Sequence, residues 1–168
     1  MKKCLVVVDM QNDFVTGALA NPDAEKIVSD INEYVKNFDG DVFFTRDTHR
    51  PNYMETQEGK KLPVPHCIEG TDGWQIVDGI NVPANSMTFN KPTFGSVDLA
   101  KYIKAAGYTE VEFCGVCTGI CVISNVSLVK AFCPETTVKV IERLCACVTP
   151  DTHKTAIEAM KTFQVDVI

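Results

Sequence analysis

Residues 3–9 read Lys-Cys-Leu-Val-Val-Val-Asp, and this stretch decides the fold class. The apolar run is unbroken and rich in valine, and it ends at an acid. Such a run is typical of a strand that is buried on both faces of a parallel sheet. We therefore expect a first strand at 3–8, with Asp9 at its carboxyl end.

Outward from this strand, helical and extended patterns alternate along the chain. Apolar residues at spacings of three and four predict helices at 23–38, 96–106, 119–132 and 150–163. Short apolar runs predict strands at 41–45, 86–90, 110–114, 136–142 and 165–168. This alternation predicts an α/β fold with three αβα layers and a central, mostly parallel sheet. In such a sheet, chemistry is expected at the carboxyl ends of the strands, near a topological switch point.

Length and charge limit the classes of function. The 168 residues are expected to form one domain, 1–168. Twenty-two acidic residues against sixteen basic ones give a net charge of −6, so nucleic acid is not an expected partner. The apolar run after Lys3 is too short for a secretory signal, and no stretch is long enough to span a membrane. We therefore expect a soluble, cytoplasmic protein.

A long polar segment at 46–73 carries two of the three histidines. Asp47 and His49 are two residues apart, so in extended backbone their side chains point to the same side, and His66 follows later in the segment. Two imidazoles and one carboxylate suit a catalytic site for Zn²⁺, Mn²⁺ or Fe²⁺. The alternative is a solvated polar loop without a metal.

Cys121 lies at the predicted start of the helix 119–132 and is the candidate nucleophile among eight cysteines. The first turn of a helix offers unpaired N–H groups and a positive dipole end, which are expected to lower the pKa of this thiol and to stabilise an oxyanion. A zinc knuckle or a redox pair at Cys114 and Cys117 is the alternative. In a reducing compartment the remaining cysteines are expected to be small buried hydrophobes.

Two further ionisable residues follow strands. Asp9 comes after the first strand, and Lys91 follows the strand 86–90 just before a proline. Each also has an ordinary explanation, since an acid after a strand is often a turn residue and most lysines are simply solvated. The sequence contains no G-x-G-x-x-G, Walker or G-x-S-x-G motif, which disfavours dinucleotide, nucleotide and serine-hydrolase sites.

The motifs together resemble those of the isochorismatase-like cysteine hydrolases, and within that family those of nicotinamidases (pyrazinamidases). The resemblance runs in order through Val-Val-Asp-Met-Gln-Asn-Asp-Phe at 7–14, Thr-Arg-Asp-Thr-His at 45–49, Pro-His-Cys-Ile-Glu-Gly-Thr at 65–71, Lys91, and Gly-Val-Cys-Thr-Gly-Ile-Cys-Val at 115–122. It implies the isochorismatase-like, Rossmann-like fold.

The resemblance also implies catalytic roles. Cys121 would be the nucleophile, Asp9 its general base, and Lys91 the cation that stabilises the thiolate and positions Asp9. The backbone N–H groups of Cys117 and Cys121 would hold the oxyanion, after a cis peptide at Val116-Cys117. The implied reaction converts nicotinamide to nicotinic acid and ammonia through a Cys121 thioester, as in NAD salvage.

A metal centre is implied as well. The residues matching its ligands are Asp47, His49 and His66, and the ion would be one divalent transition metal, zinc first and manganese or iron as alternatives, bound to the pyridine nitrogen. Tyr53 stands where many nicotinamidases have a third histidine. We expect Glu58 to be the additional ligand, with Glu55 as the fallback.

The implied substrate pocket includes Phe14 as an aromatic wall, whereas its usual aromatic partner is missing from residues 62–65. Gly119 stands where the family has an acid before the nucleophile, and its backbone donor is retained. A small amide is the expected partner, and a homo-oligomer is possible. Alternative functions are a cysteine amidohydrolase of the same fold that acts on another small amide, and a thiol-redox or metal-binding protein.

Overall fold

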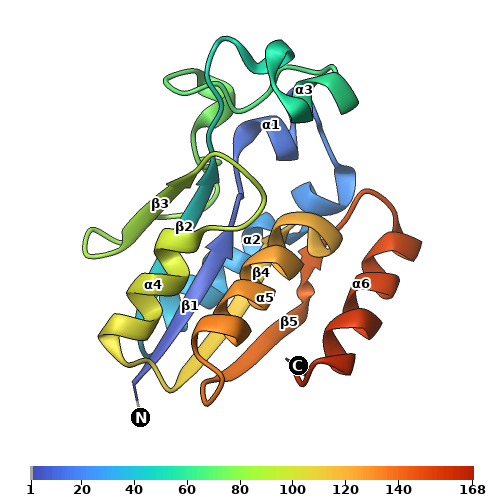
Figure 1. Cartoon of the computed structure of the whole chain (residues 1–168). Helices are drawn as coiled ribbons and strands as arrows, with labels where there is room; N and C mark the ends of the chain where they lie inside the picture. The colour runs from blue at the N-terminus through green and yellow to red at the C-terminus, as the bar shows by residue number, and fades with distance from the viewer. Residues whose placement is uncertain (1) are drawn as a thin grey trace.

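A six-stranded parallel sheet forms the centre of the computed structural model, which describes residues 2–168 (Figure 1). The strand order is β3-β2-β1-β4-β5-β6, and every pairing is parallel. The strands are β1 (Lys3–Val8), β2 (Asp41–Asp47), β3 (Met87–Lys91), β4 (Glu110–Val116), β5 (Thr137–Ala146) and β6 (Asp166–Val167). The predicted α/β class is confirmed.

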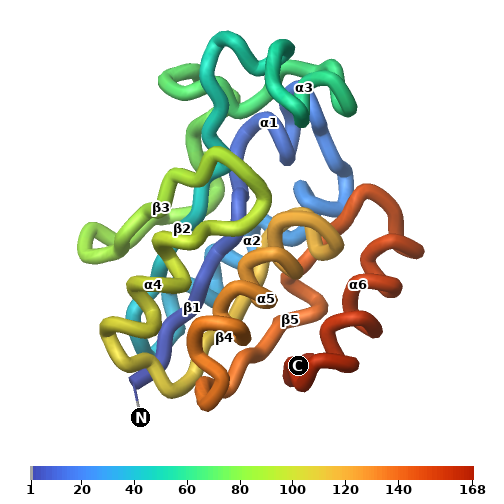
Figure 2. Tube along the Cα trace, in the orientation of Figure 1, coloured from blue at the N-terminus to red at the C-terminus, as the bar shows by residue number. Residues whose placement is uncertain are grey.

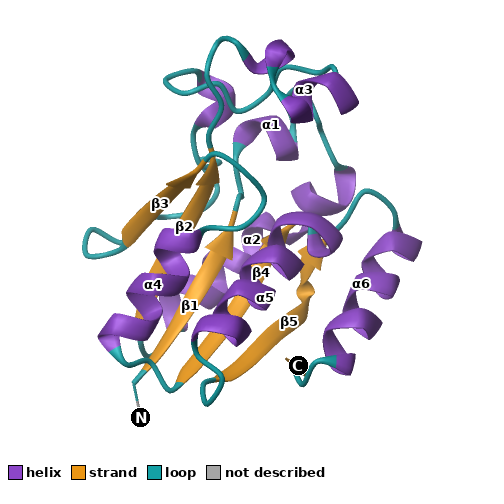
Figure 3. Ribbon diagram, viewed as in Figure 1, coloured by secondary structure: helices purple, strands orange, loops and turns teal. Residues whose placement is uncertain are grey.

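Helices cover both faces of the sheet, as Figure 3 shows. They are α1 (Asn12–Val15), α2 (Pro22–Asn37), α3 (Gln57–Lys61), α4 (Val97–Ala106), α5 (Ile123–Phe132) and α6 (Pro150–Thr162). Alternate residues of β1 enter two separate cores: Cys4, Val6 and Val8 pack with α4, α5 and α6, whereas Leu5 and Val7 pack with α2. This two-sided burial is why β1 is apolar at every position.

Local chemistry sets the ends of these helices. The side chains of Asn21, Ser96 and Thr149 accept hydrogen bonds from backbone N–H groups in the first turns of α2, α4 and α6. Gly107 ends α4 in the left-handed region, with φ 71°. The predicted helices at 23–38, 96–106 and 150–163 are therefore confirmed with ends shifted by one residue.

Three strands extend further than the sequence predicts. β2 and β4 continue to Asp47 and Val116, and β5 continues from the predicted end at 142 to Ala146. The register between β4 and β5 jumps from Phe113–Val140 to Gly115–Cys145, so β5 contains an irregularity that lets its charged residues at 142–143 remain exposed. The predicted helix at 119–132 was also incomplete, because Thr118–Val122 forms a π-helical turn before α5 begins.

The carboxyl ends of the strands meet at one edge of the sheet. β2 and β3 lie on one side of β1 and β4 lies on the other, so the topological switch point falls between β1 and β4. The segment between β2 and β3 arches beyond this edge, where it carries α3 (Figure 2). Within residues 2–168, the longest apolar stretch of any helix falls short of what a bilayer crossing requires.

Candidate active site

Asp9, Lys91 and Cys121 come together at the switch point. Lys91 is the last residue of β3, and its Nζ lies 2.6 Å from Asp9 Oδ2. The Cys121 thiol lies next to Asp9, and the Thr45 hydroxyl donates to Asp9 Oδ1 over 2.6 Å. All three predicted residues are at least 95% buried, so Lys91 is not a solvated lysine, and Asp9, although it lies in a turn, points its carboxylate into the interior.

The charges of this group depend on one another. Burial raises the pKa of Asp9, and the ammonium of Lys91 opposes that rise. For Lys91, burial alone would lower the pKa, but the carboxylate of Asp9 outweighs it and the net shift is upward. Lys91 therefore stays protonated, and burial makes the carboxylate of Asp9 a stronger base than an exposed one.

Cys121 differs from expectation in its electrostatics. Burial raises the pKa of the Cys121 thiol, and the negative charge of Asp9 raises it further. The sequence pattern predicted a lowered pKa from the helix dipole, and that prediction was wrong because the thiol is enclosed next to a carboxylate. The proton remains on sulfur, within reach of Asp9.

The nucleophile sits on a turn that several bonds fix in place. The peptide Val116-Cys117 is cis, as the resemblance implied. The carbonyl of Cys117 accepts hydrogen bonds from the N–H groups of Ile120 and Val122, and neither bond uses the N–H of Cys121. The π-helical geometry of Thr118–Val122 thus leads directly from the end of β4 to the thiol.

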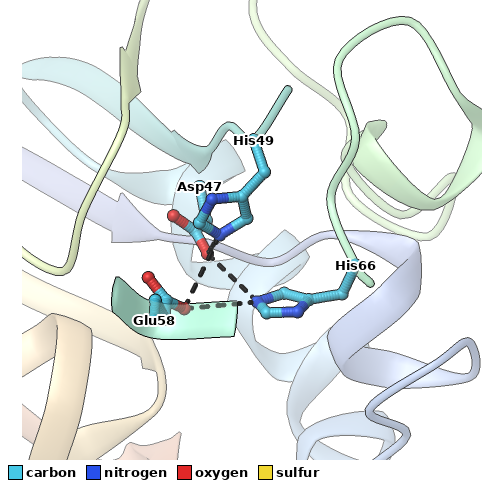
Figure 4. A group of neighbouring side chains, drawn as sticks. All are labelled: Asp47, His49, Glu58 and His66. Carbon is cyan, nitrogen blue, oxygen red and sulfur yellow. Dashed lines mark hydrogen bonds and ion pairs between the residues drawn. The ribbon is translucent and has the colours of Figure 1, made fainter. Parts of the chain in front are cut away.

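A second cluster, Asp47, His49, Glu58 and His66, lies beside the first (Figure 4). Each residue offers one donor atom, and the four atoms lie within 4.8 Å of one another. His49 Nε2 is 3.0 Å from Asp47 Oδ2 and 3.6 Å from Glu58 Oε1; His66 Nε2 is 3.5 Å and 3.7 Å from the same two atoms. This four-residue set contains no cysteine, so a zinc knuckle at Cys114 and Cys117 finds no support in it.

The donor set fits a divalent metal. Ligands about 2.0–2.2 Å from a zinc ion stand about 3.0–3.6 Å apart, close to the spacings of these four atoms. The Val64 carbonyl contacts His66 Nδ1 at 2.8 Å, which directs the other ring nitrogen toward Asp47 and Glu58. Asp47 Oδ2 faces both imidazoles, whereas the buried Oδ1, which lacks a hydrogen-bond partner among the described residues, lies 3.8 Å from Lys91 Nζ. One carboxylate of Asp47 thus links the two clusters.

The sequence offers two glutamates as the additional ligand, and the structure brings one of them to the cluster. Glu58 extends from α3 toward both histidines, whereas Glu55 is exposed in the preceding 3₁₀ turn. Tyr53, which replaces a histidine of related sequences, packs its ring 4.7 Å from that of His49 and 5.0 Å from that of His66. Its buried ring thus supports the two imidazoles.

A cavity of about 620 Å³ joins the two clusters. Its lining includes Cys121 and Cys117 on one side, and Asp47, Glu58 and His66 on the other. Phe14 also lines it and stacks 5.5 Å from the ring of His66. Most side chains predicted for the site therefore line this cavity. The exceptions are Asp9, Lys91 and His49, and each of them contacts a residue that lines it.

Sequence reasoning missed three supporting residues. Thr45 donates to Asp9, as described above. The Gln11 amide bridges both backbone groups of Asp47, accepting from its N–H at 2.7 Å and donating to its carbonyl at 2.9 Å. Asn125 donates to the Cys121 carbonyl at 2.8 Å and accepts from the Ser96 N–H. Gln11 and Thr45 carried a signal, since they lie within the motifs 7–14 and 45–49.

Comparisons with known proteins agree with this arrangement. The sequence profile of the Isochorismatase domain matches residues 3–168. The nicotinamidase/pyrazinamidase of Mycobacterium tuberculosis is 27% identical, with 99% of this chain and 98% of that protein covered. A nicotinamidase of Saccharomyces cerevisiae is 34% identical over an alignment of 108 residues, with 46% of this chain and 50% of the yeast protein covered.

A solved structure extends the likeness to three dimensions. Pyrazinamidase of Pyrococcus horikoshii in complex with zinc superposes with a TM-score of 0.88 at 27% identity, over 100% of this chain and 99% of that one. The resemblance inferred from the motifs is thus confirmed over the length of the molecule. The chain belongs to the isochorismatase family.

Proposed function

We propose that this protein is an amidohydrolase of the nicotinamidase type, converting nicotinamide to nicotinic acid and ammonia. The observation that carries the proposal is the pairing of two clusters across one cavity. A thiol beside a carboxylate and an ammonium faces a set of four metal-ligating donors. The names of the relatives and of the zinc-bound neighbour support the same substrate class.

The first half-reaction begins with a proton transfer. Asp9 takes the proton of the Cys121 thiol while the sulfur attacks the carboxamide carbon. The raised pKa values of both groups suit this transfer, because the thiol keeps its proton until the base receives it at the moment of attack. Lys91 holds Asp9 in place and offsets the negative charge of the sulfur.

Collapse of the tetrahedral intermediate releases ammonia. The backbone N–H groups of Cys117 and Cys121 hold the oxyanion, and Asp9 returns the proton to the leaving nitrogen. In the second half-reaction, Asp9 deprotonates a water molecule that cleaves the Cys121 thioester. The carboxylic acid product and the free thiol complete the cycle.

Asp47, His49, Glu58 and His66 are proposed to hold one divalent transition metal ion, with zinc first and manganese or iron as alternatives. When bound, the ion supplies Lewis acidity that anchors a ring nitrogen of the substrate. Phe14, next to His66, is proposed to pack against the ring and so to orient the carboxamide toward Cys121.

A second candidate is hydrolysis of another small amide by the same thiol chemistry. The observation that favours it is the composition of the cavity wall. Leu62 lines the cavity in the segment before the metal histidine, so the aromatic side chain that usually faces Phe14 in nicotinamidases is absent from residues 62–65. An aliphatic wall is less selective for a flat aromatic ring.

Release of ammonia from nicotinamide, pyrazinamide and aliphatic amides tests the proposal. We expect turnover of the two aromatic amides by zinc-loaded protein and none by the Cys121→Ala variant. Cys133→Ala is the matched control, since Cys133 is also buried but lies at the far end of α5. Turnover by Cys121→Ala equal to that of the wild type contradicts the mechanism, and turnover restricted to aliphatic amides favours the second candidate.

The proposal includes one domain over 1–168 and a cytoplasmic role in recycling the pyridine ring for NAD synthesis. The match of one domain profile to residues 3–168 supports the first part. The eight cysteines support the second, because all are free thiols, as in proteins of a reducing compartment.

A further inference from the structure

Cys117 and Cys147 occupy equivalent positions just beyond two neighbouring strands. The last register pair of β4 and β5 is Val116–Ala146, and the residue that follows each strand is a cysteine. Figure 3 shows both strands ending at the same edge of the sheet. Adjacent strands are about 4.8 Å apart, which lies within the Cα separation that a disulfide spans.

The sulfur of Cys147 accepts a hydrogen bond from the turn that carries Cys121. The Gly119 N–H donates to Cys147 Sγ over 3.4 Å. A Cβ on Gly119 would lie 3.5 Å from the same sulfur, so this turn packs directly against Cys147. A backbone N–H that points at a sulfur stabilises negative charge there.

The two thiols consequently share one proton unequally. The neighbouring Cys117 thiol lowers the pKa of Cys147 to about 5, against the opposing effect of burial. The same interaction, together with burial, raises the pKa of Cys117. At neutral pH the pair is a thiolate at Cys147 beside a thiol at Cys117.

Cys147 is alone among the eight cysteines in having a lowered pKa. The pKa values of the others are raised, with burial the first or second cause in each; they are Cys4, Cys67, Cys114, Cys117, Cys121, Cys133 and Cys145. Because the thiolate is the reactive form, an oxidant is expected to select Cys147 over the catalytic thiol.

Both cysteines line cavities. Cys117 lines the active-site cavity, and Cys147 lines two others of about 380 and 230 Å³. Cys147 itself is only 4% exposed, which favours a compact reagent over a bulky one.

We propose that Cys147 and Cys117 form a hydroperoxide-responsive dithiol. The Cys147 thiolate attacks one oxygen of hydrogen peroxide, which gives a sulfenic acid at Cys147 and, after protonation, water. The thiol sulfur of Cys117 then displaces the hydroxyl group, which leaves as a second water, and a Cys117–Cys147 disulfide forms. Sulfur loses two electrons in all, and the peroxide gains them.

Closure of the disulfide alters the catalytic turn. Cys117 carries one of the two N–H groups proposed to hold the oxyanion, and the Gly119 N–H loses its thiolate acceptor. Turnover is expected to fall and to return after reduction. This consequence rests on the proposed function, whereas the chemistry of the pair does not.

Mapping by mass spectrometry tests the chemistry without any activity measurement. Cys121→Ala protein is treated with hydrogen peroxide, alkylated and digested. We expect a loss of about 2 Da and a linked peptide pair joining Cys117 to Cys147. Cys145→Ser in the same background is the matched control, because Cys145 lies two residues away on β5, and it should retain the link, whereas Cys147→Ser should abolish it. A link that persists in Cys147→Ser, a stable adduct on Cys147 alone, or no mass change overturns the proposal.

Activity is then compared in protein with an intact Cys121. For each variant, the rate of ammonia release after peroxide treatment is divided by the rate of the same protein before treatment. We expect peroxide to remove most of the ammonia release of wild type and Cys145→Ser, reversibly with dithiothreitol, and to spare Cys147→Ser. If peroxide inactivates Cys147→Ser as much as wild type, the disulfide does not control turnover, even where mass spectrometry detects it. Absence of ammonia release from any untreated protein contradicts the proposed function and leaves the mapping result standing.

Discussion

Asp9 meets two demands that few residue types satisfy together. Its backbone lies in the left-handed region, with φ 49°, where asparagine and aspartate are among the few residues with side chains that occur readily. Its side chain is also fully buried against Lys91, and the proposed mechanism requires it to be a base. Asparagine keeps the first property and loses the second, so the two can be separated by one substitution.

At this residue we predict that Asp9→Asn lowers kcat/KM by about 10²–10⁴-fold, because the general base is lost while the turn is kept. Unfolding should also become easier, by about 3–5 kcal/mol, because the substitution leaves the buried ammonium of Lys91 without its nearest counter-charge. Steady-state kinetics and chemical denaturation measure the two effects.

The double variant Asp9→Asn with Lys91→Met is the control. It removes both charges, so we expect stability to return toward that of wild type while activity stays low. Recovery of activity in the double variant would show that Asp9 acts only by balancing the charge of Lys91.

Contact between β1 and β4 sets the distance between the base and the nucleophile. Gly115 pairs with Val8, one residue before Asp9, and lies two residues before Cys117. Its φ is 111°, and a Cβ at this position would overlap the carbonyl oxygen of Val8 and come within 2.8 Å of the Val8 nitrogen. The two strands approach this closely only because residue 115 has no side chain.

We predict that Gly115→Ala destabilises the protein by more than about 3 kcal/mol and reduces turnover of the folded fraction, since β1 and β4 must separate. Gly107→Ala is the matched control. Gly107 also has a positive φ, 71°, but a Cβ there meets nothing within 4 Å, so about 1–2 kcal/mol should be lost with normal activity. Equal effects of the two substitutions on turnover would refute a role for the close contact.

Across the whole molecule, the proposed metal ligands come from separate segments. Asp47 ends β2, Glu58 lies on α3, and His66 follows in the connection to β3. A metal held by them links the segment that arches beyond the sheet to the sheet edge itself. Because such a site forms only in the folded chain, binding contributes to folding stability.

We predict that a chelator lowers the melting temperature by about 5–10 °C, since zinc at about a hundredfold excess over Kd contributes about 2.7 kcal/mol to a domain of this size. Zinc should restore the loss. Glu58→Ala should reduce both the shift and the bound zinc, and Glu55→Ala, which alters an exposed neighbour, should change neither. Identical metal content in the two variants would show that Glu58 is not a ligand. A melting temperature that does not change with chelation would show that the metal does not stabilise the fold.

Much of this fold was predictable, because strand and helix patterns are local. The run at 3–8 is buried on both faces as expected, and the helix ends at Ser96 and Gly107 follow from capping chemistry. The end of β5 was not predictable, because the register jump after Phe113 is a property of two paired strands and leaves no local signal.

The sequence by itself determined the parallel α/β class, the family and the candidate catalytic and metal-ligating residues, because each of these follows from motifs and periodicity along the chain. Only the tertiary structure decided that Glu58 rather than Glu55 meets the histidines, that Cys121 keeps its proton, and that Cys147 lies beside Cys117. The physical reason is the same in all three cases. Burial and hydrogen bonds between distant segments set the distances and charges of these groups, and neither can be deduced from neighbours in the chain.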